Sequence, residues 1–257
     1  MRPAGSQDHG GGGLAECAEI WDLLRRQRVY ADGLHISHRR REKAALLAAA
    51  LQEFAPAGRG LRACDFGCAD AAIPKLLLES EVGPRLQEYL GITLLNYNQQ
   101  SPKRFHRHPR LQVRVGDLEQ PLPRVLPDLE RSSFDVVTAT GFFHYLERPE
   151  RALENAAWLL RPGGLLLTMT PVGWLLRLRR SRLLAAPQRN RLIRRELPPA
   201  TFLPLAAAAG FHLRRGTRVQ FTGLPWAPIR WFEQSLAQAG LLAWLGTNYF
   251  FVHVRAG

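Results

Sequence analysis

The feature that most constrains the fold is a regular alternation of short apolar runs with helix-like segments between residues 61 and 170. Apolar and β-branched residues predict strands at 61–66, 86–92, 111–115, 134–140 and 165–169. Helical spacing predicts helices at 71–80, 97–106 and 149–160, and a Pro-Gly-Gly stop at 162–164 follows the last of these. Strands and helices in this order build an α/β fold, in which helices cover both faces of a parallel sheet.

The flanking segments extend this pattern into one domain. Apolar residues recur at helical spacing over 14–55, where Asp32 and Gly33 interrupt them and Ser37 is placed to cap a second helix. Beyond the core, we expect helices at 203–209 and 229–239 and strands at 211–221 and 248–254. We therefore expect a flexible tail (1–13) and a single domain (14–257) that comprises N-terminal helices (14–56), a core (61–170) and a basic helical insertion (171–200).

Composition favours a globular protein without a membrane span. The chain has 257 residues, of which 46% are hydrophobic, and no run approaches the roughly 20 apolar residues that a spanning helix needs. The first residues lack an apolar region, so we expect no secretory signal. Three cysteines without nearby ligand clusters predict neither a disulfide framework nor a metal site, and we expect a cytoplasmic location.

The net charge of +13 is concentrated in one segment. Residues 172–196 contain eight arginines and one acid, a local charge of +7 that leaves +6 for all other residues. Such a segment can cover an anionic small molecule, rest on an anionic membrane surface as a peripheral contact, or follow the phosphate backbone of a nucleic acid. A solvated helix face in an arginine-rich chain is the fourth interpretation, and the sequence leaves all of them open.

Several motifs together resemble one enzyme family. They are CDFGCADAAIPKLL, YLGITLLN, LQVRVGDLEQPLP, FDVVTATGFFHYLERPERALENAAWLLRPGGLLLTMTP and YFFVHVRAG. In this order they resemble the class I S-adenosylmethionine-dependent methyltransferases over residues 61–170, and more loosely over the last fifty residues. The resemblance implies a Rossmann-like, seven-stranded, mostly parallel sheet whose last strand is antiparallel, and S-adenosyl-L-methionine as the cofactor.

The resemblance also assigns a cofactor site along the carboxyl ends of the strands. The loop after the first strand, with Asp65, Gly67 and Ala69, wraps the methionine end of the cofactor in this family. Thr140 and Gly141 after the fourth strand face the same end. For the nucleoside, the resemblance assigns Thr93 and Asn96 to the ribose, Asp117 to the adenine amino group and Leu118 to the adenine ring.

Three positions depart from the family pattern. Ala69 and Ala71 stand where glycine is common, and a positive φ at either alanine would cost on the order of 1 kcal/mol. Thr93 replaces an acidic residue that accepts hydrogen bonds from both ribose hydroxyls, and one hydroxyl group cannot reproduce a bidentate charged acceptor.

His144 and Tyr145 are the candidate catalytic residues. An oxygen or nitrogen acceptor must lose a proton at or near methyl transfer, and histidine titrates in the suitable range. The alternative is structural, with His144 anchoring the next helix and Tyr145 packing against it.

We therefore expect an enzyme that methylates a small-molecule or lipid-like acceptor. One alternative is an RNA methyltransferase that binds through the basic segment 172–196. The other is a non-catalytic, methyltransferase-like scaffold subunit, which the residues at 69, 71 and 93 motivate. The motifs leave the methylated atom and the oligomeric state open.

Overall fold

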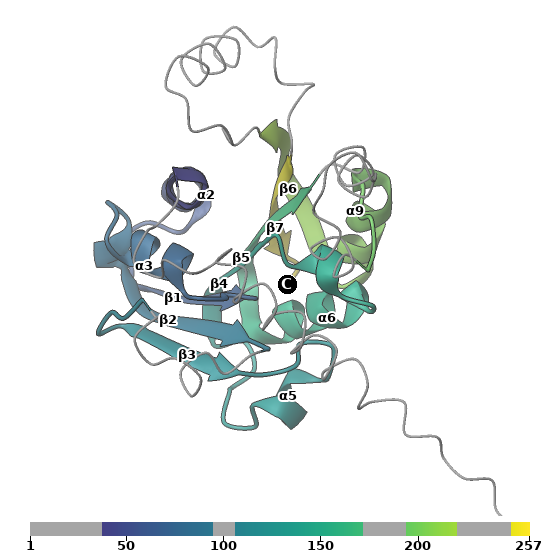
Figure 1. Cartoon of the computed structure of the whole chain (residues 1–257), viewed down its shortest axis with the longest axis horizontal. Coiled ribbons are helices and arrows are strands. Elements are labelled where there is room, and N and C mark those ends of the chain that lie inside the picture. The colour runs from purple at the N-terminus through teal and green to yellow at the C-terminus, as the bar shows by residue number, and fades with distance from the viewer. Residues whose placement is uncertain (1–37, 95–105, 172–193, 220–247) are drawn as a thin grey trace, which may run out of the picture.

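The computed structural model describes residues 38–94, 106–171, 194–219 and 248–257. Their strands form one seven-stranded sheet in the order β3-β2-β1-β4-β5-β7-β6 (Figure 1). Strands β1 to β5 pair in parallel, and β7 pairs antiparallel with both β5 and β6. The strands are β1 Leu61–Phe66, β2 Leu86–Thr93, β3 Leu111–Val115, β4 Phe134–Thr140, β5 Leu160–Pro171, β6 Phe211–Val219 and β7 Asn248–Arg255.

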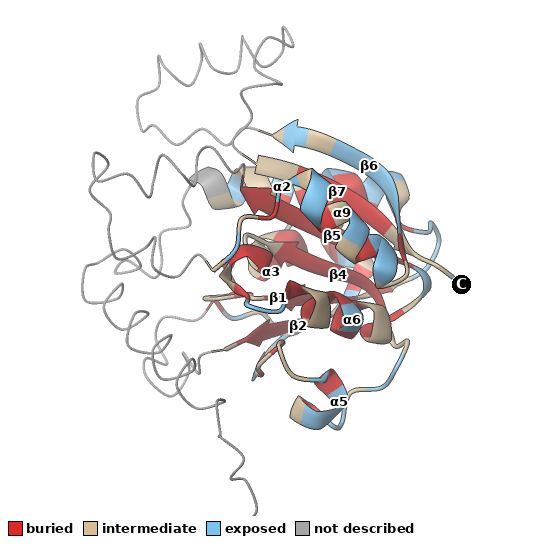
Figure 2. Cartoon of the chain, turned by 90° about the vertical axis from the view of Figure 1, so that its right-hand side faces the viewer, coloured by how far each residue is buried: buried red, intermediate tan, exposed pale blue. Residues whose placement is uncertain are grey.

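Helices cover both faces of the sheet and divide the core into two clusters. Helices α2 (His38–Phe54) and α3 (Ala72–Leu78) pack on one side, which we call the α2–α3 face, with buried residues such as Leu47, Leu77, Ala63 and Val136. Helices α5 (Leu122–Val125), α6 (Pro149–Leu159) and α9 (Pro199–Ala208) pack on the other. Buried residues concentrate in the central strands, whereas β6 is mostly exposed (Figure 2).

The predicted fold class is confirmed, with small differences at element ends. Strands β1, β3 and β4 have the expected bounds. Strand β5 begins earlier than expected because Leu160 already pairs with Phe134, and this pairing ends α6 at Leu159. The sequence did not predict α5 or the two 3-10 helices, η1 (Gly83–Arg85) and η3 (Phe143–Tyr145).

Several helical predictions fall outside the described residues. These are the first N-terminal helix, the cap at Ser37, nearly all of the helix at 97–106, the helix at 229–239 and most of the insertion at 171–200.

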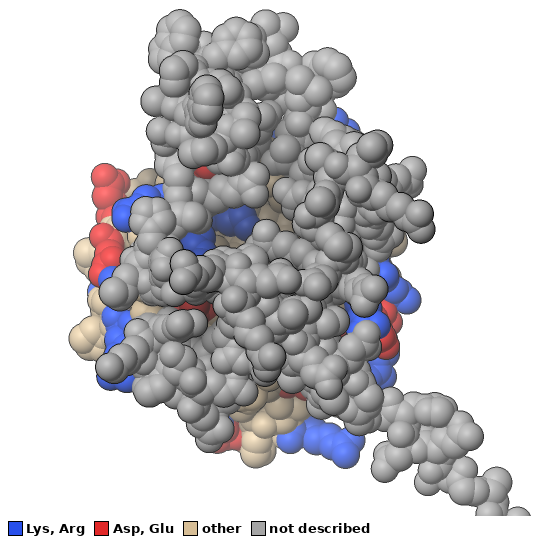
Figure 3. Space-filling model, in the orientation of Figure 1, with Lys and Arg blue, Asp and Glu red and all other residues tan. Residues whose placement is uncertain are grey.

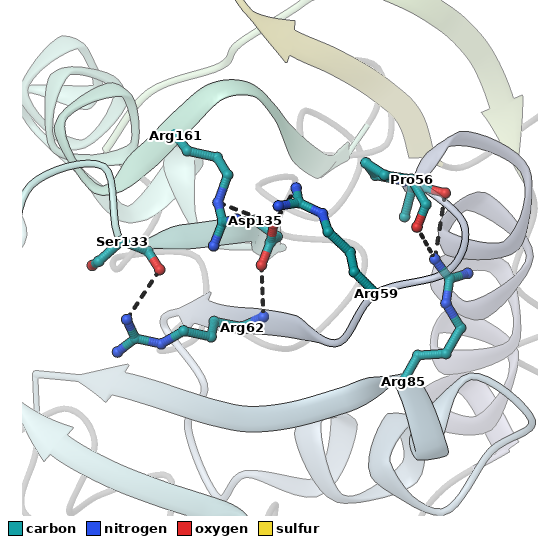
Figure 4. Close-up of polar contacts among 8 residues, drawn as sticks. Pro56, Arg59, Arg62, Arg85, Ser133, Asp135 and Arg161 are labelled. Atoms are coloured by element: carbon teal, nitrogen blue, oxygen red, sulfur yellow. Dashed lines mark hydrogen bonds and ion pairs between the residues drawn. The ribbon is translucent and has the colours of Figure 1, made fainter.

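The amino ends of the central strands meet in a cluster of ion pairs. Asp135 at the start of β4 is buried, and its Oδ1 lies 2.6 Å from Nη2 of Arg59 and 3.0 Å from Nε of Arg161 (Figure 4). Its other oxygen accepts a hydrogen bond of 2.9 Å from the backbone N–H of Arg62. This carboxylate ties β1, β4, β5 and the loop before β1 together at one edge of the sheet.

Candidate active site

The loop after β1 turns sharply at the carboxyl edge of the sheet. The backbone N–H groups of Gly67 and Cys68 both donate to the carbonyl of Ile92, at 2.9 and 3.1 Å. Gly67 has φ 75°, and a Cβ atom at this position would lie 2.5 Å from the ring of Phe142. Glycine is therefore required at position 67 both by the backbone angle and by the space available.

The two alanines that follow lie in the left-handed region. Ala69 has φ 50° and Ala71 has φ 60°, so the cost considered for a positive φ applies at both positions. Asp70 between them holds the loop: its Oδ2 lies 2.6 Å from Nη1 of Arg40, and its Oδ1 accepts a hydrogen bond from the N–H of Ala72. The loop thus keeps a conformation suited to glycine, stabilised by an ion pair to α2.

Asp65 places a buried carboxylate at the carboxyl end of β1. The residue is 2% exposed, and its Oδ1 accepts a 2.6 Å hydrogen bond from the hydroxyl of Thr138 on β4. The Tyr89 hydroxyl lies 3.1 Å from the same Thr138 oxygen, so it is placed to donate to it. Burial raises the pKa of Asp65 to about 7, and the Thr138 hydrogen bond and the charge of Lys43 oppose this rise.

The end of β4 contributes a second turn beside this loop. Thr140 is the last residue of the strand, and Gly141 follows with φ 71° while its N–H donates to the carbonyl of Met169. A Cβ atom on Gly141 would lie 3.7 Å from Cε1 of His144 and 3.8 Å from Nζ of Lys43. Side chains from η3 and α2 therefore approach the backbone at this turn.

His144 and Tyr145 lie next to each other in η3. Their rings have centroids 4.0 Å apart, and His144 is 6% exposed while Tyr145 is half-buried. The carbonyl of His144 accepts hydrogen bonds from the N–H groups of Arg194 and Arg195. The main chain at His144 thus anchors residues 194–195, which serves a structural role in addition to any role of the ring.

The ends of β2 and β3 carry the residues assigned to the nucleoside. Thr93 is buried, and its carbonyl accepts a hydrogen bond from Gly116. Asp117 accepts a 2.9 Å hydrogen bond from the N–H of Glu119, so one of its carboxylate oxygens stabilises the turn. Leu118 is buried in the core on the α6 side of the sheet. Asn96 lies outside the described residues.

Sequence reasoning missed three residues that shape this edge. Asn155 on α6 accepts a hydrogen bond from Leu122 N–H and donates to the carbonyls of Leu118 and Gln120, which fixes the loop after β3. A polar residue on the apolar face of a predicted helix is the signal that would have found it. No sequence pattern marks Thr138 or Lys43, because Thr138 lies on β4 and Lys43 on α2, whereas Asp65, on which both act, lies on β1.

The structure therefore brings Asp65, Gly67, Gly141 and His144 to neighbouring turns at the ends of β1 and β4. The second group follows β2 and β3 at the same edge. Among the described residues, no three potential metal ligands form a cluster. In that same part of the chain, no helix has the length and apolar character needed to cross a bilayer.

Comparisons with known proteins agree with this arrangement. Residues 64–166 match the model of a family described as a methyltransferase domain. A search of curated protein sequences found no match. Similar solved structures include a methyltransferase from Haloferax volcanii in complex with the Trm112 methyltransferase activator. This structure is 17% identical, with a TM-score of 0.62, and the match covers 93% of this chain and 97% of the other.

Two further structures show the same fold. One is 1,6-didemethyltoxoflavin-N1-methyltransferase from Burkholderia thailandensis with bound 1,6-didemethyltoxoflavin and S-adenosylhomocysteine. It is 15% identical, with a TM-score of 0.60 and coverage of 100% of this chain and 94% of the other. The other is an S-adenosylmethionine-dependent methyltransferase from Mesorhizobium loti, 19% identical, with a TM-score of 0.56 and coverage of 80% and 96%. At sequence identities this low, the similarity to these three structures shows a shared fold only.

Proposed function

We propose that the chain is a class I S-adenosylmethionine-dependent methyltransferase that transfers a methyl group from S-adenosylmethionine to a small-molecule or lipid-like acceptor. The match of residues 64–166 to a methyltransferase-domain model and the fold shared with solved methyltransferases support this proposal. The observation that carries this proposal is the buried carboxylate of Asp65 at the carboxyl edge, between the turns that contain Gly67 and Gly141. In open α/β sheets, ligands bind at this edge, where the strand order reverses. Here the order reverses between β1 and β4.

The residues at the end of β1 fit the amino acid end of the cofactor. Within the described contacts, Asp65 accepts one side-chain hydrogen bond, from Thr138, and burial disfavours its charged form. A bound ammonium group would offset that cost, because an opposite charge nearby stabilises a buried carboxylate. The methionine ammonium of S-adenosylmethionine is such a group, so the site suits this end of the molecule.

The residues after β2 and β3 suit the nucleoside less directly. We propose that Thr93, with Asn96, contacts the ribose, and that Asp117 and Leu118 contact the adenine. Thr93 is buried and neutral, and one oxygen of Asp117 already stabilises its own turn. The ribose is therefore held by fewer charged contacts than is usual for the family, and we expect a correspondingly lower cofactor affinity.

The chemistry needs a positioned acceptor and, for oxygen or nitrogen acceptors, a base. When bound, S-adenosylmethionine supplies an electrophilic methyl group on its sulfonium. We propose that His144 takes the acceptor proton at Nε2, because Nδ1 is buried, and that Tyr145 orients the imidazole through ring contact. Gly141 has no side chain, so a ligand can approach the backbone of this turn closely.

The acceptor class is proposed from the basic segment. Residues 172–193 lie outside the described part of the chain, but Arg194 and Arg195 lie 3.4 and 3.6 Å from carboxylate oxygens of Glu147 and Glu150. The arginines between 172 and 193 favour an acceptor with an anionic group, or a lipid-like acceptor presented at an anionic surface. We also propose a cytoplasmic location, which the buried free thiols of Cys64 and Cys68 support.

A second candidate, the non-catalytic scaffold, draws support from the strained alanines. The positive φ values at Ala69 and Ala71 strain the loop, and the neutral Thr93 stands where a charged ribose contact is expected. A scaffold would keep the fold without binding S-adenosylmethionine at useful affinity.

Labelled S-adenosylmethionine distinguishes these functions. The purified protein is incubated with [methyl-³H]S-adenosylmethionine and a cell extract, which is then separated into polar small molecules, lipids and RNA. Label in the small-molecule or lipid fraction is expected. Label in RNA would instead support the RNA methyltransferase, and no label in any fraction would support the scaffold. The variant Asp65→Asn, which removes the ammonium-binding charge, is the control for enzyme-dependent labelling.

A further inference from the structure

A lysine from the N-terminal helix α2 acts on the buried carboxylate at the end of β1. Lys43 precedes Ala44, which is buried, and Leu47 one turn later packs in the core of the α2–α3 face. These contacts fix the side of α2 that meets the sheet. The charge of Lys43 lowers the pKa of Asp65, against the larger effect of burial, so its ammonium lies within electrostatic reach of the carboxylate.

The side chain of Asp65 points toward the face of the sheet on which α2 and Lys43 lie. Along β1, Leu61 and Ala63 pack on the α2–α3 face, whereas Cys64 and Phe66 pack on the opposite face. Successive side chains of a strand alternate between faces, so Asp65 points to the side that α2 covers. Thr138, its hydrogen-bond partner, follows the same alternation from Val136 on β4.

The Lys43 ammonium also approaches the turn after β4. Its Nζ lies 3.8 Å from the position of a Cβ on Gly141, and Cε1 of His144 lies 3.7 Å from the same position. Lys and Arg side chains are visible in Figure 3 near the centre of the view, next to the place of α2 in Figure 1. The cation from α2 thus acts on the anion at the end of β1 and also lies beside the Gly141 turn, so all three belong to one end of the site.

This pairing of charges matches one part of the cofactor. The amino acid group of S-adenosylmethionine carries an ammonium and a carboxylate on the same carbon. A carboxylate in the protein alone would attract the first and repel the second. On the basis of the proposed function, we infer that Lys43 binds the carboxylate of this amino acid group while Asp65 binds its ammonium. Lys43 is then a further cofactor-binding residue, supplied by the N-terminal helix rather than by a strand end.

Two ligands that differ only at the amino acid end test this inference. S-adenosylhomocysteine carries the complete amino acid group, whereas 5′-methylthioadenosine has the same nucleoside and thioether without it. Isothermal titration calorimetry measures the affinity of each ligand for wild type, Lys43→Met, Lys43→Arg and Arg41→Met. Arg41 is an exposed neighbour on the same helix, so Arg41→Met is a control for the loss of one positive charge.

The expected pattern is selective. Lys43→Met weakens S-adenosylhomocysteine binding by about tenfold or more and leaves 5′-methylthioadenosine binding unchanged, because only the first ligand loses a charge partner. Lys43→Arg restores part of the affinity, and Arg41→Met has wild-type affinities. Equal losses for both ligands, or no loss for either, would overturn the role of Lys43.

Failure of the proposed function gives a different result in the same experiment. A wild-type protein that binds neither ligand at millimolar concentration would refute the cofactor site itself, and the role of Lys43 with it. A wild-type protein that binds both ligands, with Lys43→Met indistinguishable from it, would refute the role of Lys43 alone. A thermal unfolding curve for Lys43→Met confirms that the variant is folded before titration.

Discussion

The amino and carboxyl edges of the sheet each contain a buried aspartate, and the two carboxylates differ in how many charged partners the protein gives them. At the amino edge, Asp135 is 3% exposed and contacts two guanidinium groups and a backbone N–H. At the carboxyl edge, Asp65 is 2% exposed, and its one described hydrogen bond comes from a neutral hydroxyl. The first carboxylate is compensated inside the fold, whereas the second is only partly compensated.

This difference separates a structural role from a binding role. A buried charge that the protein pairs completely contributes to the fold, because removing it leaves its partners unpaired. A buried charge that is paired incompletely costs stability, and a ligand of opposite charge can recover that cost.

The largest predicted effect comes from exchanging each aspartate for asparagine. Asp135→Asn should lower the free energy of unfolding by about 3 kcal/mol, near the low end for a broken buried pair because Arg59 and Arg161 keep some contact with water. Asp65→Asn should leave stability at pH 8 unchanged or raised, because it removes a poorly solvated charge. Urea unfolding of both variants measures the difference, and equal destabilisation would remove the distinction between the edges.

His253, which is buried in strand β7, predicts that the fold loses stability in acid. Burial among Phe202, Phe211 and Phe251 lowers the pKa of His253 to about 4. The unfolded chain takes up a proton as the pH falls below about 6.5, and the folded protein does so only near 4. Stability is therefore lost as the pH falls through that window, by about 2 kcal/mol between pH 8 and pH 5.

His253→Leu should abolish this contribution, and His212→Leu is the matched control on the exposed neighbouring strand β6. Urea unfolding at pH 8 and pH 5 gives the loss for each variant. The prediction fails if His253→Leu loses as much stability on acidification as the wild type. The measured contribution of His253 also allows the effect of Asp65, which has the opposite sign, to be extracted from the pH profile.

The smallest predicted effect concerns the strained loop. Ala69→Gly should stabilise the protein by about 0.5 kcal/mol, because relief of the left-handed strain exceeds the added entropy of the unfolded chain. Ala49→Gly, at an exposed position within α2, should destabilise by about 1 kcal/mol. Thermal unfolding of both variants checks the opposite signs. Destabilisation by Ala69→Gly would show that the loop does not favour glycine.

The fold was predictable from the sequence where local pattern and tertiary pairing agree. Strands β1, β3 and β4 are short, apolar and bounded by turn residues, so their ends were found. The early start of β5 depends on the pairing of Leu160 with Phe134, which no local pattern contains. Helix α5 is a single turn stabilised through Asn155, and it is too short to have a periodicity.

The site was predictable only as far as its motifs extend. Asp65, Gly67 and Gly141 stand at strand ends, where the order of the sheet determines their proximity. Lys43 is one cation on a helix with several, and only the packing of this helix shows that its charge lowers the pKa of Asp65. The φ values of Ala69 and Ala71 likewise had to be observed, because the sequence allowed either sign. The cofactor-binding and catalytic roles of all the site residues stay predictions. These residues are Asp65, Gly67, Ala69, Thr93, Asn96, Asp117, Leu118, Thr140, Gly141, His144 and Tyr145.

Calorimetric titration with S-adenosylhomocysteine at pH 6 and pH 8 tests the central claim most directly. If Asp65 binds the ligand ammonium in its charged form, wild-type affinity should increase by roughly tenfold over this range, since the pKa of the free carboxyl is about 7. Asp65→Asn should bind weakly at both pH values. Wild-type binding that is independent of pH and equal to that of Asp65→Asn would contradict a cofactor site at the carboxyl end of β1.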